Sequence, residues 1–444
     1  MTDLLAFWLP LALSWAMMAA AQPLVTAGIG RLPDAPVHLA AYGVTLDLAV
    51  LMESPIIMMF SASVALARDQ ESYRLLRQFM LGVSGVLTAV FAAVTFTPLG
   101  QWALIHIVGV PSDVADPAAH ALVWLLPWVP AIAWRRFHQG PLLTAGRPRL
   151  ISYGTAGRLL ALTAVVGAGT RWPVLPGTSL GAVALSTSVV VEALLATWWA
   201  RPLVRRLPSG GSPGLTLRSV WGFYLPLAAT DLMRVISRPV TTAGIARAAA
   251  AGPSLSAWPV SHGLVMLVCS GVMAFQEMVV ALAGAAPPER RVERFVMVTG
   301  AVFTVALAIL AATPALSDYL TAVVRLPPDL RPLAIAGVRW MVPLPLLLAV
   351  RNLLRGILIH RRRTPWVQHA MTAYLVTLAG GLAMGVWGGM TGVVLAAAST
   401  VAAQVVEVGV LAVALSLARG LPVGTPASTA NVYSSPIPGG RRMP

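Results

Sequence analysis

Residues 7–12 read Phe-Trp-Leu-Pro-Leu-Ala, and residues 223–228 read Phe-Tyr-Leu-Pro-Leu-Ala, an offset of 216 residues. The same offset relates further pairs of proline, threonine and arginine residues, without a gap over about 140 residues: Pro23 and Pro239, Thr97 and Thr313, Pro98 and Pro314, and Arg135 and Arg351. An apolar chain produces scattered alanine and leucine matches by chance, but not proline and arginine matches in one register. The chain is therefore a duplicated unit, a layout common among membrane transporters.

The composition is that of a membrane protein. The chain has 444 residues, of which 57% are hydrophobic and 11% are charged, and its mean hydropathy is +0.77. Apolar stretches long enough to cross a bilayer as helices recur along it. We predict twelve of them, centred near residues 17, 53, 88, 130, 160, 188, 231, 270, 302, 344, 376 and 405. The expected fold is an all-α membrane protein with twelve transmembrane helices in two pseudo-symmetric six-helix bundles.

The repeat predicts the domain organisation. Residues 1–204 form an N-lobe of six transmembrane helices, residues 205–217 a cytoplasmic linker, residues 218–420 a C-lobe of six helices, and residues 421–444 a disordered cytoplasmic tail. Because each repeat holds an even number of helices, both enter the membrane with the same sense. The lobes should then be related by an axis along the membrane normal.

The basic residues predict the orientation. All 31 are arginine, and loops on the side of the linker carry about 18 of them, against about five on the opposite side (Arg31, Arg171, Arg247, Arg325 and Arg331). Positively charged loops stay in the cytoplasm. We therefore expect a multi-pass protein of the inner (plasma) membrane with both termini cytoplasmic, and we interpret the net charge of +15 as a topology signal rather than a nucleic-acid surface.

The absence of lysine excludes a P-loop, a kinase lysine and a Schiff base in this chain. The single cysteine, Cys269, excludes a disulfide within the chain and a cysteine-based metal site. We expect no enzyme, no cofactor and no bound metal.

Charged residues inside the apolar segments are the candidate functional residues, because such groups are costly in a bilayer and usually face a cavity or a partner. Asp231, Arg234 and Arg238 share one face of the seventh segment, and form either half of an anion site or a salt-bridge network between helices. The equivalent residues Arg135 and Arg351 could clamp a multivalent anion, or extend to the cytoplasmic headgroups.

Two kinds of carboxylate accompany these arginines. Glu192 and Glu407 end equivalent helices, and either carry a coupling proton or pair with an arginine of their own lobe. Asp47, Glu53 and His262 occur in one repeat only, which favours a specialised role. The predicted substrate-binding residues are Arg135, Arg234, Arg238, Arg351, Arg355 and His262. The predicted coupling residues are Asp47, Glu53, Asp231, Glu192 and Glu407.

Three short stretches resemble a known family. Residues 39–44 (Leu-Ala-Ala-Tyr-Gly-Val) resemble Leu-Ala-Ser-Tyr-Gly-Leu of the progressive ankylosis protein family, residues 236–239 resemble its Ile-Ser-Arg-Pro, and residues 258–262 (Trp-Pro-Val-Ser-His) resemble its Tyr-Pro-Val-Gly-His. That family lies within the multidrug/oligosaccharidyl-lipid/polysaccharide exporter (MOP) superfamily, which also contains the MATE exporters. The resemblance implies export of polyvalent anions such as pyrophosphate, ATP or citrate, and carries over Arg238 and His262. Beyond His262 this chain is more apolar than the family.

The sequence thus predicts a secondary active transporter of small multivalent anions, with a proton or sodium ion as the possible coupling ion. Its partners would be that substrate and membrane lipid, with no nucleic acid, and the protein would be a monomer. The alternatives are a lipid-linked oligosaccharide flippase, a cation-coupled multidrug exporter, and a membrane scaffold or receptor subunit without transport.

Overall fold

The computed structural model describes residues 2–145, 147–209, 215–282, 289–360 and 363–419, and these are helical with short connections. The predicted tail and part of the linker lie outside the described residues. The N-lobe contains α1 (Thr2–Ile29), α2 (Ala35–Ile57), α3 (Met59–Leu66), α4 (Gln70–Phe96), α5 (Pro98–Trp102), η1 (Ala103–Val108), α6 (Ser112–Leu122), η2 (Val123–Leu125), α7 (Trp128–Thr144), α8 (Pro148–Arg171) and α9 (Gly177–Val204).

The C-lobe repeats this order of elements. It contains α10 (Leu217–Val235), α11 (Ser237–Ala246), α12 (Ala251–Met273), α13 (Phe275–Leu282), α14 (Glu289–Ala312), α15 (Pro314–Asp318), η3 (Tyr319–Val323), α16 (Arg331–Trp340), α17 (Leu344–His360), α18 (Thr364–Trp387) and α19 (Gly392–Arg419). The offset of 216 residues converts the bounds of α2, α3, α7 and α8 into those of α12, α13, α17 and α18. The two six-helix bundles are therefore pseudo-symmetric, as the repeat predicts.

The repeat extends to unusual backbone conformations. Asp34 and Ala250 both have a positive φ, 51° and 52°, at the turn before α2 and α12. Gly109 and Arg325 also have a positive φ, 84° and 57°, after the π-helical turns η1 and η3. Such angles are strained for residues other than glycine. Both repeats therefore keep the same turn even where the glycine has been replaced.

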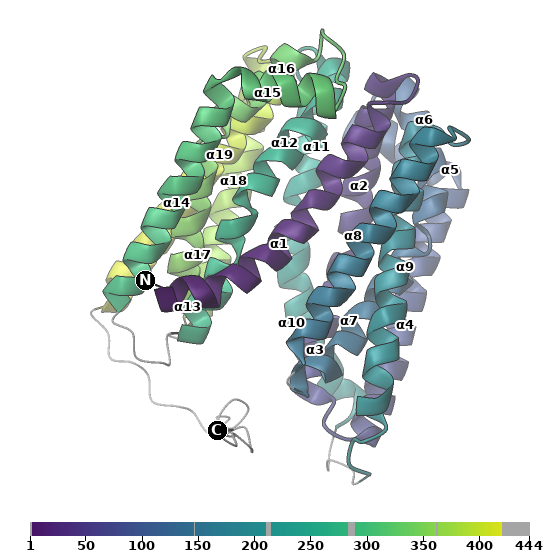
Figure 1. Cartoon of the computed structure of the whole chain (residues 1–444), viewed down its shortest axis with the longest axis vertical. Coiled ribbons are helices and arrows are strands. Elements are labelled where there is room, and N and C mark those ends of the chain that lie inside the picture. Colours follow the sequence, from purple (N-terminus) through teal and green to yellow (C-terminus); the bar gives the residue numbers. More distant parts are fainter. Residues whose placement is uncertain (1, 146, 210–214, 283–288, 361–362, 420–444) are drawn as a thin grey trace.

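The first helix of each repeat crosses to the other lobe. Trp8 of α1 donates a hydrogen bond from Nε1 to the carbonyl oxygen of Gly271 in the C-lobe, at 2.9 Å. Tyr224 of α10, the equivalent of Trp8, donates to the carbonyl oxygen of Pro55 in the N-lobe, which is the equivalent of Gly271. Figure 1 shows α1 beginning beside α13 and α14 of the C-lobe and ending among the N-lobe helices. Each lobe therefore donates its first helix to a contact with the other lobe.

The helices are long and apolar enough for a membrane. Among the described residues, ten helices qualify by length and composition, and the pair α6/η2 and α7, bent by 43°, makes up to eleven. The predicted segment that falls short is the seventh. It consists of α10 and α11, separated at Ile236, and it carries Asp231, Arg234 and Arg238. These charges lower its hydropathy, so composition alone does not identify it as a span.

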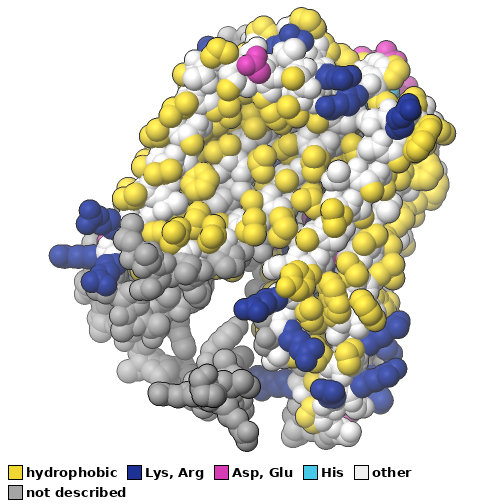
Figure 2. Space-filling model, in the orientation of Figure 1, with side chains coloured by type: hydrophobic (Ala, Val, Ile, Leu, Met, Phe, Trp, Pro, Cys, Tyr) yellow, Lys and Arg dark blue, Asp and Glu magenta, His cyan; other side chains and the backbone are white. Residues whose placement is uncertain are grey.

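The surface is divided into two arginine-bearing ends and an apolar face between them. Arginine side chains gather near the lower end of the molecule and in a smaller group near the upper end, and the face between them is mainly apolar (Figure 2). The lobes converge at the end formed by α6, α15 and α16, and diverge toward the end where the chain passes from α9 to α10 (Figure 1). α1 and α2 pack against α12 where the lobes meet.

Candidate functional site

A pocket lies between the lobes, at the level where they converge. α1 and α2 of the N-lobe contribute residues to it, as do α11, α12, α18 and α19 of the C-lobe. The pocket is open on one side and holds about 70 Å³ of space for water-sized groups. Its lining residues are Gln22, Gly43, Leu46, Asp47, Ser237, Arg238, Thr241, Trp258, Pro259, His262, Tyr374 and Thr400.

An ion pair joins the two lobes in this pocket. Arg238 Nε of α11 donates to Asp47 Oδ1 of α2 at 2.8 Å, and Thr242 Oγ1 donates to Asp47 Oδ2 at 2.5 Å. The side chain of Arg238 is 32% exposed. The predicted substrate residue His262 lines the same pocket and lies against Trp258, with ring centroids 5.1 Å apart. Three residues chosen from separate stretches of sequence therefore meet at one site.

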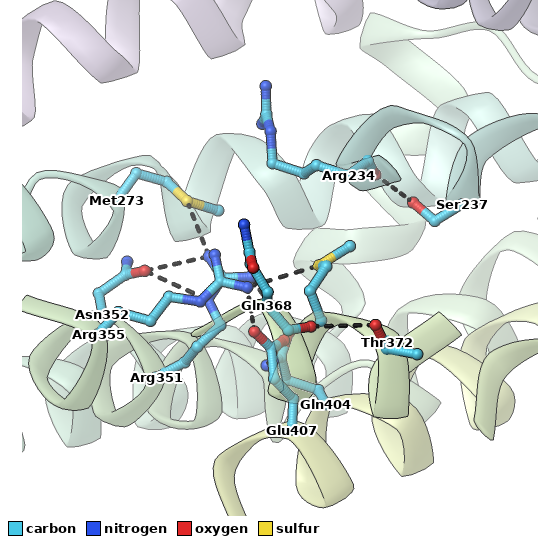
Figure 3. Close-up of polar contacts among 11 residues, drawn as sticks. Arg234, Ser237, Met273, Arg351, Asn352, Arg355, Gln368, Thr372, Gln404 and Glu407 are labelled. Atoms are coloured by element: carbon cyan, nitrogen blue, oxygen red, sulfur yellow. Dashed lines mark hydrogen bonds and ion pairs between the residues drawn. The ribbon is translucent and has the colours of Figure 1, made fainter. Parts of the chain in front are cut away.

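A second polar cluster lies inside the C-lobe (Figure 3). Arg355 of α17 pairs with Glu407 of α19, and Gln404 Nε2 donates to Glu407 Oε2 at 2.9 Å. Arg351 bonds neutral oxygens: Nη2 donates to Asn352 Oδ1 at 3.1 Å and Nη1 to Gln404 Oε1 at 3.4 Å. Within the part of the chain that the structure describes, Arg351 has no carboxylate partner. Its positive charge is therefore not neutralised by an ion pair.

Arg234 lies close to this cluster but points away from it (Figure 3). Its guanidinium group pairs with Asp231 at 2.8 Å, and its side chain remains 55% exposed. Arg351 is repelled by Arg355, attracted by Glu407 and repelled more weakly by Arg234. The buried atom Asp231 Oδ2 has no hydrogen-bond partner among the described residues. Within the described part of the C-lobe, Arg351 therefore lacks a carboxylate partner, the Arg234 side chain is largely exposed, and Asp231 Oδ2 lacks a hydrogen-bond donor.

The N-lobe holds a more fully paired cluster. Arg135 of α7 pairs with Glu192 of α9 at 2.7 Å, and Arg158 of α8 lies 3.9 Å from the same carboxylate. Gln139 and Thr155 each donate to Glu192 Oε1 at 3.3 Å. Only 4% of Arg135 is exposed. Of the two roles considered for Glu192, the structure shows the pairing within the lobe.

The two lobes use different arginines for this pair. Glu407 is equivalent to Glu192, but it pairs with Arg355, which occupies the position of Gln139. Arg351, which occupies the position of Arg135, is thereby left without a carboxylate. The predicted clamp between Arg135 and Arg351 stays a prediction, and each of the two arginines lies in a cluster of its own lobe.

Glu53 and Arg136 complete the N-lobe cluster. Glu53 is buried, its Oε2 has no hydrogen-bond partner among the described residues, and it interacts electrostatically with the arginines at positions 135, 136 and 158. The Nε atom of Arg136 is likewise buried without a partner in the described ranges. Burial of polar atoms without a hydrogen bond is costly. Glu53 therefore stays a candidate for coupling.

Sequence reasoning missed Arg158 and Thr242. Arg158 is a single charge within an apolar stretch, which was a usable signal. Thr242 is a neutral side chain, and it becomes relevant only because α11 brings it against Asp47 of the other lobe. The described residues contain no group of three or more histidine, cysteine, aspartate or glutamate side chains that could hold a metal ion.

Comparisons with known proteins identify the fold. No family model and no curated protein matches the sequence. Among solved structures, the chain is similar to an inward-facing multidrug resistance MATE family transporter of the MOP superfamily, with 15% identity and a TM-score of 0.67 over 94% of this chain and 99% of that one. It is also similar to the lipid II flippase MurJ in an inward closed conformation, with 11% identity and a TM-score of 0.72 over 91% and 86%.

A third similar structure is that of a MOP superfamily transporter from Pyrococcus furiosus, described as having a binding pocket of reverse polarity. It has 15% identity and a TM-score of 0.59, over 93% of this chain and 96% of that one. At these identities the comparisons show that the chain has the fold of the MOP superfamily transporters. The similarity concerns the fold and does not assign the chain to a particular family.

Proposed function

We propose that the protein is a secondary active transporter that exports small multivalent anions, such as pyrophosphate, a nucleotide or a citrate-like carboxylate. The lobes would alternate access to a cavity between them. Three features support this: the fold shared with MOP superfamily transporters, the pocket at the lobe interface, and arginines in both lobes that lack a full set of anionic partners.

The observation that carries the proposal is Arg351. A guanidinium group inside a membrane helix normally finds a carboxylate, because an unpaired charge is costly there. Arg351 donates hydrogen bonds only to neutral partners among the described residues. Arg355 repels it, Glu407 attracts it without forming an ion pair, and Arg234 repels it more weakly. The side chain of Arg234 points away from Arg351 in this conformation (Figure 3), so it would turn toward Arg351 for both guanidinium groups to donate to one multivalent anion. Together with Arg238 and His262, they form the proposed substrate site.

The proposal also covers the orientation in the membrane, the coupling ion and the family. The side from which the linker departs would face the cytoplasm of a cell bounded by an inner (plasma) membrane. Because the lobes diverge toward that side, the conformation would be inward-facing. Asp47, Glu53, Asp231, Glu192 and Glu407 would include the coupling group, for a proton or a sodium ion. Arg238 and His262 lie in stretches that resemble the progressive ankylosis protein family, which we propose as the nearest family within the superfamily.

Flux of radiolabelled citrate or pyrophosphate into proteoliposomes tests this function. Arg351→Gln should reduce the initial rate at least tenfold, because the arginine without a carboxylate partner is lost while the Arg355–Glu407 pair remains. Arg339→Gln is the matched control. It removes an exposed arginine of α16 whose Nε donates to the carbonyl oxygen of Ala311 at 3.2 Å, and its flux should equal that of the wild type. Equal flux in the Arg351 variant would overturn the assignment.

The second candidate is a flippase for lipid-linked oligosaccharides. The similarity to MurJ over 91% of this chain favours it, and a lipid-linked diphosphate would also need arginines. Translocation of a fluorescent lipid-linked diphosphate, with no flux of free citrate or pyrophosphate, would support the flippase instead. A multidrug exporter of cations is the third candidate, and the arginines that lack carboxylate partners disfavour it.

A further inference from the structure

The pocket between the lobes already holds an anionic group, the carboxylate of Asp47. Both of its oxygens accept a hydrogen bond from the opposite lobe, Oδ1 from Arg238 Nε at 2.8 Å and Oδ2 from Thr242 Oγ1 at 2.5 Å. A bound carboxylate ligand would be held in the same way, by a guanidinium group and a hydroxyl group. Asp47 therefore occupies positions that suit one anionic group of a substrate.

This contact differs from the other ion pairs in the described ranges. The pairs of Glu192, Asp231 and Glu407 each lie within one lobe, and only Asp47 and Arg238 join the N-lobe to the C-lobe. Further hydrogen bonds between the lobes lie beyond it, toward the end where they converge. Arg247 of α11 donates to the carbonyl oxygens of Ile107 and Val108 at the end of η1, at 2.7 and 2.5 Å.

Arg238 is accessible to a ligand. About a third of its side chain is exposed, and it lines the pocket beside the neutral residues Gln22, Thr241 and Tyr374. An anion that enters this pocket meets no carboxylate among its lining residues other than that of Asp47. The two anionic groups would then compete for one guanidinium group.

We propose that Asp47 is an intramolecular competitor of the substrate. A carboxylate or phosphate group of the substrate replaces Asp47 on Arg238 and Thr242, and this exchange breaks the ion pair between the lobes. Asp47 cannot remain in place beside the bound anion, because two neighbouring anions repel and a buried carboxylate without a partner is costly. Occupation of the site is thereby coupled to separation of the lobes. The inference rests on the proposed function and concerns the same site.

Binding of citrate and of pyrophosphate to the purified full-length protein tests the competition. Asp47→Asn keeps the shape of the side chain and removes its charge, and it should bind either probe at least tenfold more tightly than the wild type. Asp47→Glu retains the competing carboxylate and should bind as the wild type does. Monodisperse elution and an unchanged melting temperature establish that the variants are folded.

A distance measurement tests the coupling. Spin labels at positions 113 and 329 occupy exposed, repeat-equivalent sites, one on each lobe near the converging ends, in a background with Cys269→Ser. In the wild type, saturating citrate should lengthen this distance. Asp47→Asn should show the longer distance without citrate. Arg339→Gln is the control, because it removes an exposed arginine that does not line the pocket, and it should leave the distance without citrate unchanged.

The outcomes separate this inference from the proposed function. Tighter binding and a longer distance in Asp47→Asn support it. If the wild type binds the probes and Asp47→Asn binds them equally or more weakly, the competition is overturned. The proposed function is not affected by that result. Tighter binding at an unchanged distance overturns the coupling to lobe separation. No binding by any of the variants overturns both the inference and the proposed function.

Discussion

At the scale of single residues, one substitution between the repeats decides where charge is neutralised. Glu192 and Glu407 are equivalent, and each is buried with a guanidinium group of its own lobe. The N-lobe has glutamine at position 139, and the C-lobe has arginine at the equivalent position 355. Arg355 forms the ion pair with Glu407, and Arg351 therefore has only neutral hydrogen-bond partners in the described part of the chain. A buried ion pair contributes little net stability, but a buried charge that loses its partner is costly.

This account predicts the behaviour of Arg355→Gln, which gives the C-lobe the residue of the N-lobe. Arg351 should then pair with Glu407 as Arg135 pairs with Glu192, so the free energy of unfolding should fall by much less than the roughly 3–5 kcal/mol expected when a buried carboxylate loses its partner. Citrate flux should be lost, because Arg351 is no longer available to a substrate. Thermal unfolding and proteoliposome flux are the measurements.

Glu407→Gln is the comparison for that variant. It leaves Arg351 and Arg355 without a carboxylate, and it should destabilise the protein by about 3 kcal/mol. If Arg355→Gln lowered the melting temperature as much as Glu407→Gln does, the exchange of partners would be contradicted.

At the scale of helices, close contacts at glycines hold the short helices α3 and α13 against α7 and α17. A Cβ atom at Gly140 would overlap the hydroxyl oxygen of Ser63 and lie 2.6 Å from its Cβ atom, and 3.0 Å from its backbone carbon. At the equivalent Gly356, a Cβ atom would lie 2.7 Å from Cγ1 of Val279. The Cβ atom of Val279 would also lie only 2.8 Å away, but the nearest backbone atom is at 3.4 Å there and at 3.0 Å at Gly140, so the N-lobe contact is the less tolerant.

Gly140→Ala should therefore destabilise the protein by about 2 kcal/mol, in the range for overpacking of a close contact. Gly356→Ala should cost less, because each of its close contacts is longer than the corresponding contact at Gly140. Gly167→Ala in α8 is the control, since a Cβ atom there meets nothing within 4 Å, and it should stabilise the helix by up to about 1 kcal/mol. Melting temperatures of the three variants in detergent give the order, and a neutral Gly140→Ala would contradict the contact.

At the scale of the whole molecule, the lobes are joined by reciprocal contacts at one end and by an ion pair near the other. The hydrogen bonds of Trp8 and Tyr224 relate the lobes by pseudo-symmetry, whereas the pair of Asp47 and Arg238 has no symmetric copy, because position 263, the equivalent of Asp47, is glycine. A symmetric pair of lobes is thereby joined by an asymmetric contact. That asymmetry is the feature expected of a site that one substrate occupies.

The orientation of the molecule is tested by labelling single cysteines in intact cells. Cys269 is fully buried, and Cys269→Ser gives a background without cysteine. Ser209→Cys, in the linker, should react with a membrane-impermeant maleimide only after the cells are opened, whereas Asp113→Cys should react in intact cells. Positive loops on the side of the linker are the reason. The opposite pattern of labelling would reverse the topology and the proposed direction of transport.

The sequence by itself determined the fold class, the duplication and the near-equivalence of the lobes. These follow from hydropathy and from residue matches at a fixed offset, which are one-dimensional properties, and the bounds of α2 and α12 or α7 and α17 confirm them. It also pointed to Asp47, Arg238 and His262 as residues without a copy in the other repeat, and these meet in one pocket. The seventh segment was found from its place in the repeat, although neither α10 nor α11 is among the helices that qualify as spans by length and composition.

Only the tertiary structure decided which charges neutralise one another. The partners of Glu192, Glu407 and Asp47 lie 57, 52 and 191 residues away along the chain, and the choice between Arg351 and Arg355 depends on how α17 is rotated against α19. Ion pairing requires contact within a few ångströms, and helix rotation and lobe closure set that distance. Sequence spacing alone does not define either of them.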